Sequence, residues 1–189
     1  LNRTDRVVFG YEFPATWYQS INPAAIVLFA PVFAWLWIWL DRRGMQPSTP
    51  VKFAMGLMLL SVAYVAMIGG ALQADRAGLA QPHWLLIMYT MVTMGELCLS
   101  PVGLSMVTKL SPARYTSLMM GLYFGTYFVS NLAAGYLASF SKKIENGEVF
   151  TLIGGQADFF LVLAVVPAII GLLVLAVSPI IKRMMHGLH

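Results

Sequence analysis

From Phe159 to Ile181 the sequence reads FFLVLAVVPAIIGLLVLAVSPII, a run without a charged side chain. A helix needs about 20 apolar residues to cross the hydrocarbon core of a bilayer. Four earlier runs of similar length and character are Ile21–Leu40, Phe53–Leu72, Trp84–Thr108 and Tyr115–Ser141. The sequence therefore predicts an all-α membrane protein with five transmembrane helices, at about residues 16–40, 52–73, 84–109, 113–140 and 158–181.

The composition agrees with this fold class. Hydrophobic residues make up 59% of the 189 residues and charged residues 11%, whereas soluble domains have about 45–50% and roughly 25%. Such a chain is neither an ordinary soluble domain nor a disordered segment, which would lack the apolar content. Cys98 is the single cysteine, which excludes an internal disulfide framework and a multi-cysteine zinc site.

The basic residues predict an orientation. The net charge of +4 is spread over short segments between the apolar runs, a pattern that favours the lipid bilayer as a partner and argues against nucleic acid. Five spans place the two chain ends on opposite sides of the membrane. With the C-terminus inside, the inner segments carry seven of the 12 lysines and arginines and the outer segments carry five. Because inner loops are richer in these residues, we expect the N-terminus outside and the C-terminus in the cytoplasm.

Glu96 is the most informative polar residue. It lies 12 residues after Trp84, which places it about 18 Å into its span at 1.5 Å per residue. A charge near the bilayer centre costs roughly 2.5–3.5 kcal/mol on insertion scales, so such a residue is read as functional by default. The alternative is a structural carboxyl that is neutral or paired with another helix.

The residues around Glu96 support a binding site. Ser100 and Gly103 follow it at helical spacing and share its face. Pro101 cannot donate to the carbonyl of Leu97, so we expect the helix to break or kink there. Carboxylates beside broken helices at the midplane are typical of transporter sites, although a proline alone also fits a simple packing kink.

Asn22 is a second polar residue placed just inside a span, and Pro23 follows it. We expect this proline to loosen the start of the helix, as Pro101 does in the third span. The functional interpretation of Asn22 is a contribution to a binding site. The alternative is a hydrogen bond between helices, which is worth about 0.6–2 kcal/mol in membranes.

Several other functions are disfavoured. The three histidines, His83, His186 and His189, lie at span ends or in the tail, too dispersed for a metal site. No histidine at membrane depth could serve as the base of an intramembrane serine protease, and no phosphate-binding glycine loop is present. We therefore expect no catalytic residues, no metal and no cofactor, and a protein that is not an enzyme.

Two longer motifs carry a resemblance to a known family. Trp17–Pro23 reads WYQSINP and resembles the W-F-Q-S-I-N-P segment of bacterial proton-dependent oligopeptide transporters, the POT family. Gly95–Leu110 reads GELCLSPVGLSMVTKL and resembles their G-E-L-x-L-S-P-x-G-L-S-x-x-x-K-L run. Met119–Gly121 also fits, and the resemblance follows nearly the whole chain in the same order.

The resemblance implies a fold. The family belongs to the major facilitator superfamily, whose members have twelve core helices in two halves of six. The five spans then correspond to helices 8 to 12, and the chain is the C-terminal part of a permease that lacks the first half and helix 7. An odd number of spans also does not match a fold built from repeats of three helices, which independently suggests that the chain is truncated.

The resemblance also assigns roles to residues. In the family a glutamate on helix 10 receives the free amino group of the peptide, aided by an asparagine on helix 8, and these roles map onto Glu96 and Asn22. Tyr123 stands where the family usually has tryptophan on helix 11, and Thr126 lies near a family serine. With Ser100 from the stripe on the third span, these residues form the expected substrate-binding set.

The resulting hypothesis is proton-coupled symport of di- and tripeptides across the cytoplasmic membrane of a bacterium. Its partners are the peptide, protons, the bilayer and the missing N-terminal half of the transporter. One alternative is the same fold with another cargo, such as nitrate or a drug-like solute. A membrane-embedded enzyme that uses Glu96 as a base, and a non-transporting scaffold or sensor, are the others.

Overall fold

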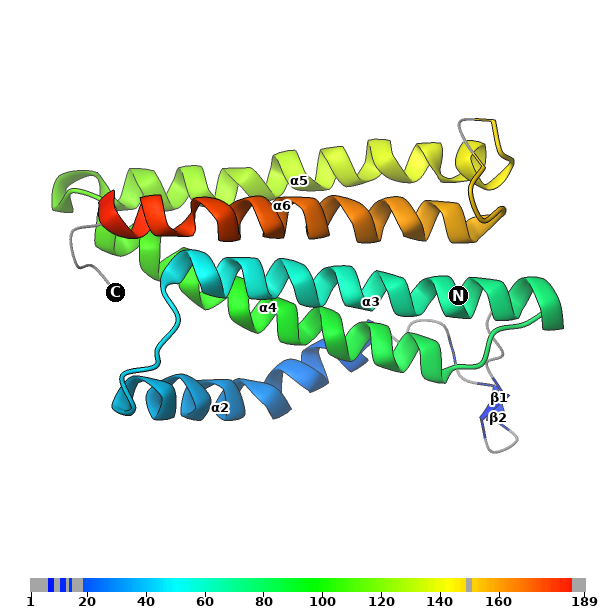
Figure 1. Ribbon diagram of the computed structural model, residues 1–189, viewed down its shortest axis with the longest axis horizontal. Coiled ribbons are helices and arrows are strands. Elements are labelled where there is room, and N and C mark those ends of the chain that lie inside the picture. The colour runs from blue at the N-terminus through cyan, green and yellow to red at the C-terminus, as the bar shows by residue number, and fades with distance from the viewer. Residues whose placement is uncertain (1–6, 9–10, 13, 15–18, 149–150, 185–189) are drawn as a thin grey trace.

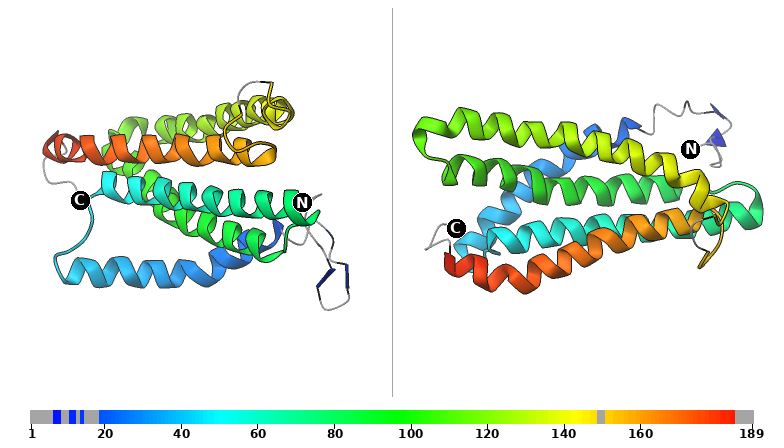
Figure 2. Two further views of the ribbon diagram at one scale, coloured as in Figure 1. Left: turned by 45° about the vertical axis from the view of Figure 1, so that its right-hand side comes forward. Right: turned by 90° about the horizontal axis from the view of Figure 1, so that it is seen from above.

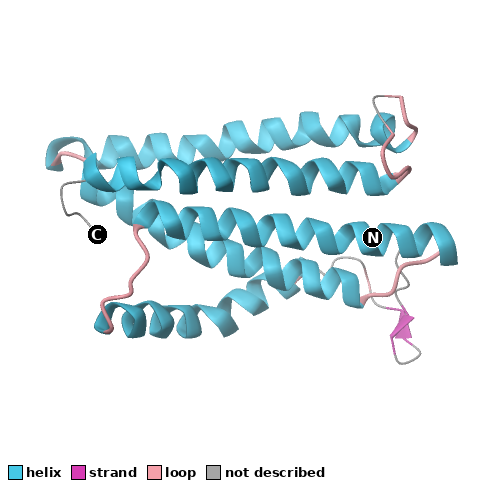
Figure 3. Ribbon diagram, in the orientation of Figure 1, coloured by secondary structure: helices cyan, strands magenta, loops and turns pink. Residues whose placement is uncertain are grey.

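A computed structural model describes residues 7–8, 11–12, 14, 19–148 and 151–184. Five long helices form most of it: α2 (Ile21–Arg42), α3 (Thr49–Ala77), α4 (His83–Leu110), α5 (Thr116–Glu145) and α6 (Gln156–Met184). A short 3-10 helix, η1 (Ala113–Tyr115), precedes α5. Two short antiparallel strands, β1 (Val7–Val8) and β2 (Tyr11–Glu12), precede α2. Figure 1 and Figure 3 show the helices running lengthwise beside one another as a bundle.

Four of these helices are long and apolar enough to cross a membrane, namely α2, α3, α4 and α6 up to Ile180. The helix α5 has 30 residues but is not among the four. Each expected span overlaps one of the five long helices. The all-helical architecture that the apolar runs predict is thus present, whereas the span boundaries stay a prediction.

The helix α3 lies at the centre of the bundle. It packs most extensively against α6 and next against α4, while α2 contacts α4, and α5 contacts α4 and α6 less closely. Figure 2 shows the same arrangement from two further directions. Small side chains line the α3–α6 contact: Ala54 and Ala164 are buried, and the Ser61 hydroxyl donates to the Ala164 carbonyl oxygen at 2.8 Å. Helices associate in membranes through close approach of this kind.

The backbones of α3 and α4 also approach each other closely. A Cβ atom on Gly95 would lie 2.9 Å from the carbonyl oxygen of Gly56, and a Cβ on Gly56 would lie 2.6 Å from the Leu99 side chain. Towards the other end of the pair, the Trp84 ring covers Gly69, and its indole nitrogen donates to Gln73 at 2.7 Å. This contact fixes the position of α4, and hence of Glu96, relative to α3.

We expect Gly56→Ala to lower the unfolding temperature of the full-length protein. Alanine favours a helix over glycine by about 1 kcal/mol, but here its Cβ meets Leu99 and the backbone of Gly95, and overpacking costs typically 1–3 kcal/mol. Gly121→Ala is the matched control, because no atom lies within 4 Å of a Cβ placed there. Thermal unfolding in detergent measures both. An equal or higher midpoint for Gly56→Ala than for the control would contradict the close packing.

Candidate functional site

Asn22 and Glu96 meet across the α2–α4 contact. The Asn22 amide nitrogen, Nδ2, donates a hydrogen bond to Glu96 Oε2 at 3.3 Å. Asn22 is the second residue of α2, and Pro23 follows in the first turn, where backbone N–H groups have no partner within the helix. Pro23 therefore lies at the start of α2 and does not interrupt it. The two residues that the sequence singled out are 74 positions apart and in contact.

Thr93 completes this cluster, and sequence reasoning missed it. Its side chain is fully buried, at 0% exposure. The hydroxyl lies 2.7 Å from Asn22 Oδ1 and 2.8 Å from the carbonyl oxygen of Tyr89, one turn earlier in α4. The available signal was its spacing, since Thr93 precedes Glu96 by three positions and so shares its helix face. We call Asn22, Thr93 and Glu96 the polar triad.

Ser100 and Pro101 lie one turn further along α4. Both are exposed in this chain, and among the described residues no hydrogen bond joins Ser100 to the polar triad. The helix α4 is continuous from His83 to Leu110, and Pro101 lies inside it. Pro101 therefore does not divide α4 into two helices. The physical reason is that a proline removes one backbone donor while the flanking turns keep theirs. The helix α2 likewise contains Pro31, and Figure 1 shows it bending between its two halves.

Tyr123 and Thr126 lie in a different place from the polar triad. They line an open groove of about 540 Å³ between α4 and α5, with Gly103, Phe53 and mostly apolar neighbours. The Tyr123 hydroxyl packs on Gly103, where a Cβ atom would lie only 2.6 Å from it. The Thr126 hydroxyl donates to the Tyr123 carbonyl oxygen at 2.6 Å. The glycine at position 103 thus leaves the space on α4 that the Tyr123 hydroxyl occupies.

The predicted set therefore divides into two parts along α4. Gly103 follows Glu96 by seven residues, which corresponds to about 10 Å of helix. The polar triad lies at one level, the Tyr123 groove lies about two turns away, and Ser100 lies between them on the exposed side. Among the described residues, no group of three or more histidine, cysteine, aspartate or glutamate side chains could hold a metal ion.

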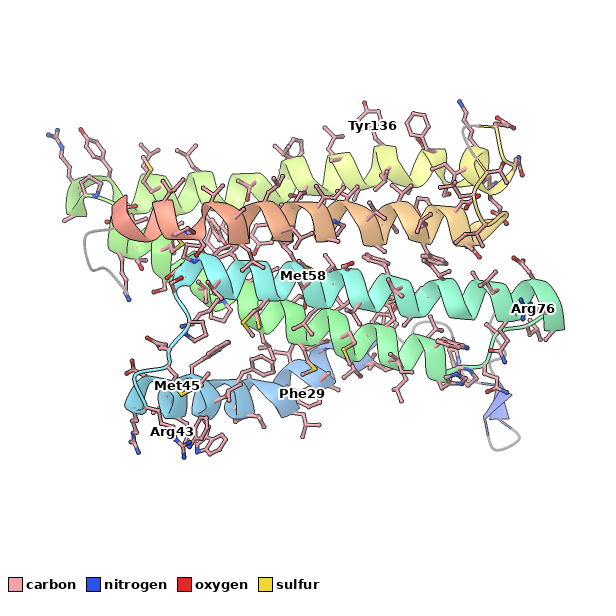
Figure 4. All side chains as sticks on the ribbon, viewed as in Figure 1. Phe29, Arg43, Met45, Met58, Arg76 and Tyr136 are labelled. Atoms are coloured by element: carbon pink, nitrogen blue, oxygen red, sulfur yellow. The ribbon has the colours of Figure 1, made fainter. Side chains whose placement is uncertain are left out.

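The helix α5 forms an open side of the bundle near the groove. Nearly all of its side chains are exposed, including apolar ones such as Leu122, Phe128 and Leu132. Tyr136 points away from the other helices in Figure 4. In a membrane protein such a face is covered either by lipid or by further helices.

The comparisons with known proteins agree with this architecture. Residues 2–153 match the family model described as PTR2, POT family. The chain is 37% identical over 187 residues to the peptide transporter YePEPT of Yersinia enterocolitica, covering 97% of this chain and 35% of that protein. It is 35% identical over 181 residues to a di-/tripeptide transporter of Lactococcus lactis, covering 93% and 34%.

Solved structures give the same result. A crystal structure of a POT peptide transporter in complex with alafosfalin matches with a TM-score of 0.81 and 34% identity, covering 96% of this chain and 35% of that one. The chain thus spans about a third of the length of the relatives that it matches. The family model covers most of the chain, and the helices superpose on those of solved members. These matches establish a multi-pass membrane protein, and the chain belongs to the POT family of transporters.

Proposed function

We propose that the full-length protein that contains this chain imports di- and tripeptides together with protons. The observation that carries the proposal is the Asn22–Glu96 hydrogen bond at 3.3 Å between two membrane helices. It presents a carboxylate, with its own amide donor, at the level where transporters of this kind bind their cargo. The relatives whose names state a substrate are peptide transporters, which supports the same substrate class here.

The chemistry of the site suits the amino end of a peptide. An ammonium group that meets a carboxylate forms a charge-assisted hydrogen bond, roughly twice as strong as a neutral one. Asn22 occupies one oxygen of Glu96 and leaves acceptor capacity on the carboxylate. A proton and the substrate's ammonium group then compete for the same carboxylate, which couples the two. An anion such as nitrate is a poor match unless the carboxyl is protonated.

The Tyr123 groove is proposed to contribute the wall beside the peptide's side chains, with Thr126 and Ser100. Its lining is mostly apolar, and it lies about two turns of α4 from Glu96. A peptide whose amino group is held by Glu96 could extend along α4 towards the groove. The remainder of the transporter would supply the opposite wall and the groups that bind the peptide's carboxylate.

The proposed location is the cytoplasmic membrane of a bacterium, with the spans at residues 16–40, 52–73, 84–109, 113–140 and 158–181. Arg43 and Arg76 lie at opposite ends of the bundle in Figure 4. We assign the Arg43 end to the cytoplasm, because the charge bias of the loops favours it. The N-terminus of this chain then lies outside.

Uptake of labelled dialanine into proteoliposomes tests the proposal. The full-length protein is expected to accumulate intact dialanine when an inward proton gradient is imposed, and to lose accumulation when a protonophore removes the gradient. No accumulation by folded protein would overturn the peptide assignment and leave the same fold with another cargo. A modified product inside the vesicles would instead indicate an enzyme.

A further inference from the structure

We infer that Thr93 is a positioning residue, which orients the Asn22 amide so that its NH2 group faces Glu96. This inference rests on the proposed function only for its effect on peptide binding. The orientation itself follows from the two hydrogen bonds within the polar triad, which no sequence motif predicts. Thr93 has a hydrogen bond to Asn22 but none to Glu96 among the described residues, so the hydrogen-bonded connection from Thr93 to Glu96 passes through Asn22.

A carboxamide is nearly symmetric in shape but not in chemistry. Its oxygen only accepts hydrogen bonds, and its nitrogen only donates them. If the Asn22 amide were turned by half a rotation, Oδ1 would face Glu96 Oε2 and two acceptors would oppose each other across 3.3 Å. What fixes the amide in the productive orientation must therefore be a donor on its other side.

Thr93 supplies that donor. Its hydroxyl lies 2.7 Å from Asn22 Oδ1, and the Thr93 side chain has no exposed surface, so this hydroxyl finds its partners within the protein. The hydroxyl has a single proton. Because Asn22 Oδ1 can only accept, the proton lies towards Oδ1 or is shared with the Tyr89 carbonyl oxygen, the second acceptor within reach, at 2.8 Å.

The consequence for the site is that Glu96 receives an oriented donor from α2. An amide that is already oriented does not have to be ordered when the peptide binds. The other charged side chains of α2, α3 and α4 lie towards the ends of these helices: Asp41 and Arg42 in α2, Lys52, Asp75 and Arg76 in α3, and Lys109 in α4. Tyr123 of α5 contacts α4 about two turns from Glu96.

The test is a double-mutant cycle in the full-length protein, with equilibrium binding of dialanine as the readout. We expect Thr93→Val, which keeps the shape and removes the hydroxyl, to weaken dialanine binding about tenfold, the size that follows from the loss of one buried hydrogen bond. Thr93→Ser, which keeps the hydroxyl, is expected to bind within about twofold of the wild type. In an Asn22→Ala background, Thr93→Val should have no further effect, because no amide remains to be oriented.

A second readout needs no peptide. The infrared carboxyl band of Glu96, identified by its loss in Glu96→Gln, is expected to shift in Thr93→Val and not in Thr93→Ser, and the shift should vanish in the Asn22→Ala background. If Thr93→Val weakens dialanine binding equally with and without Asn22, the inference is overturned, because a purely structural role of Thr93 does not depend on Asn22. That outcome leaves the proposal of peptide transport intact. If the wild type does not bind dialanine, the proposed function fails, and the infrared cycle alone decides whether Thr93 orients the amide.

Discussion

Replacing Glu96 by glutamine is expected to weaken the binding of dialanine by the full-length protein about 10- to 100-fold. Glutamine keeps the shape of the side chain and can still accept from Asn22, but it carries no charge to meet the ammonium group of the peptide. A hydrogen bond to a charged group is worth about 1.5–3 kcal/mol, and each 1.4 kcal/mol corresponds to about a factor of ten in affinity. Equilibrium binding of dialanine to the purified variant and wild type measures the change.

Dialanine with an acetylated amino group provides the matched control, because it lacks the ammonium group that Glu96 is proposed to bind. Glu96→Gln should weaken dialanine much more than the acetylated peptide. Equal effects on both ligands would mean that Glu96 supports the structure of the site and does not contact the amino group.

The five helices and the two main residues of the site, Asn22 and Glu96, could be predicted from the sequence because each prediction depends on a short segment. Each helix corresponds to an apolar run, because only a helix satisfies its own backbone within lipid. Glu96 was identified because a charge inside such a run is costly. The pairing with Asn22 came from the family resemblance, and the structure brings these two side chains into contact.

Other parts of the site depend on contacts between distant segments, which spacing alone does not specify. A threonine among apolar residues is common in membrane helices, so the role of Thr93 became visible only when Asn22 of α2 was placed beside it. The separation of Tyr123 from Glu96 likewise depends on where α5 meets α4, and that contact is set by Gly103. Pro101 was expected to kink or open α4; the helix is continuous through it, and a kink at this position stays a prediction.

Asp158 is a further residue whose role could not be foreseen. In the sequence it marks the last charge before the final apolar run. In the structure it is fully buried, at 0% exposure, and its carboxylate accepts from the backbone N–H groups of Leu152, Ile153 and Gly154 at 2.8–3.1 Å. Gly154 adopts a φ of 101°, in the left-handed region, where glycine is the residue of least strain. The carboxylate thereby fixes the turn that leads into α6.

Asp158→Ala is expected to lower the free energy of unfolding of the full-length protein by about 3 kcal/mol or more. A bond to a charged acceptor is worth about 1.5–3 kcal/mol, and removal of the carboxylate takes this partner from the N–H groups of Leu152, Ile153 and Gly154 together. Thermal unfolding in detergent measures the loss. Glu148→Gln is the matched control in the same loop, because Glu148 is exposed and surface substitutions usually change stability by less than about 0.5 kcal/mol.

Asp158→Asn separates the two physical effects of burying this carboxylate. If the cost of removing the charge from water outweighed its hydrogen bonds, the neutral amide would be as stable as the wild type or more so. The geometry leads to the opposite expectation. All three partners of Asp158 are donors, whereas asparagine offers one acceptor oxygen and an NH2 group that would face an N–H donor. Asp158→Asn should therefore be destabilised nearly as much as Asp158→Ala, and a wild-type unfolding temperature would show that the charge is not what holds the turn.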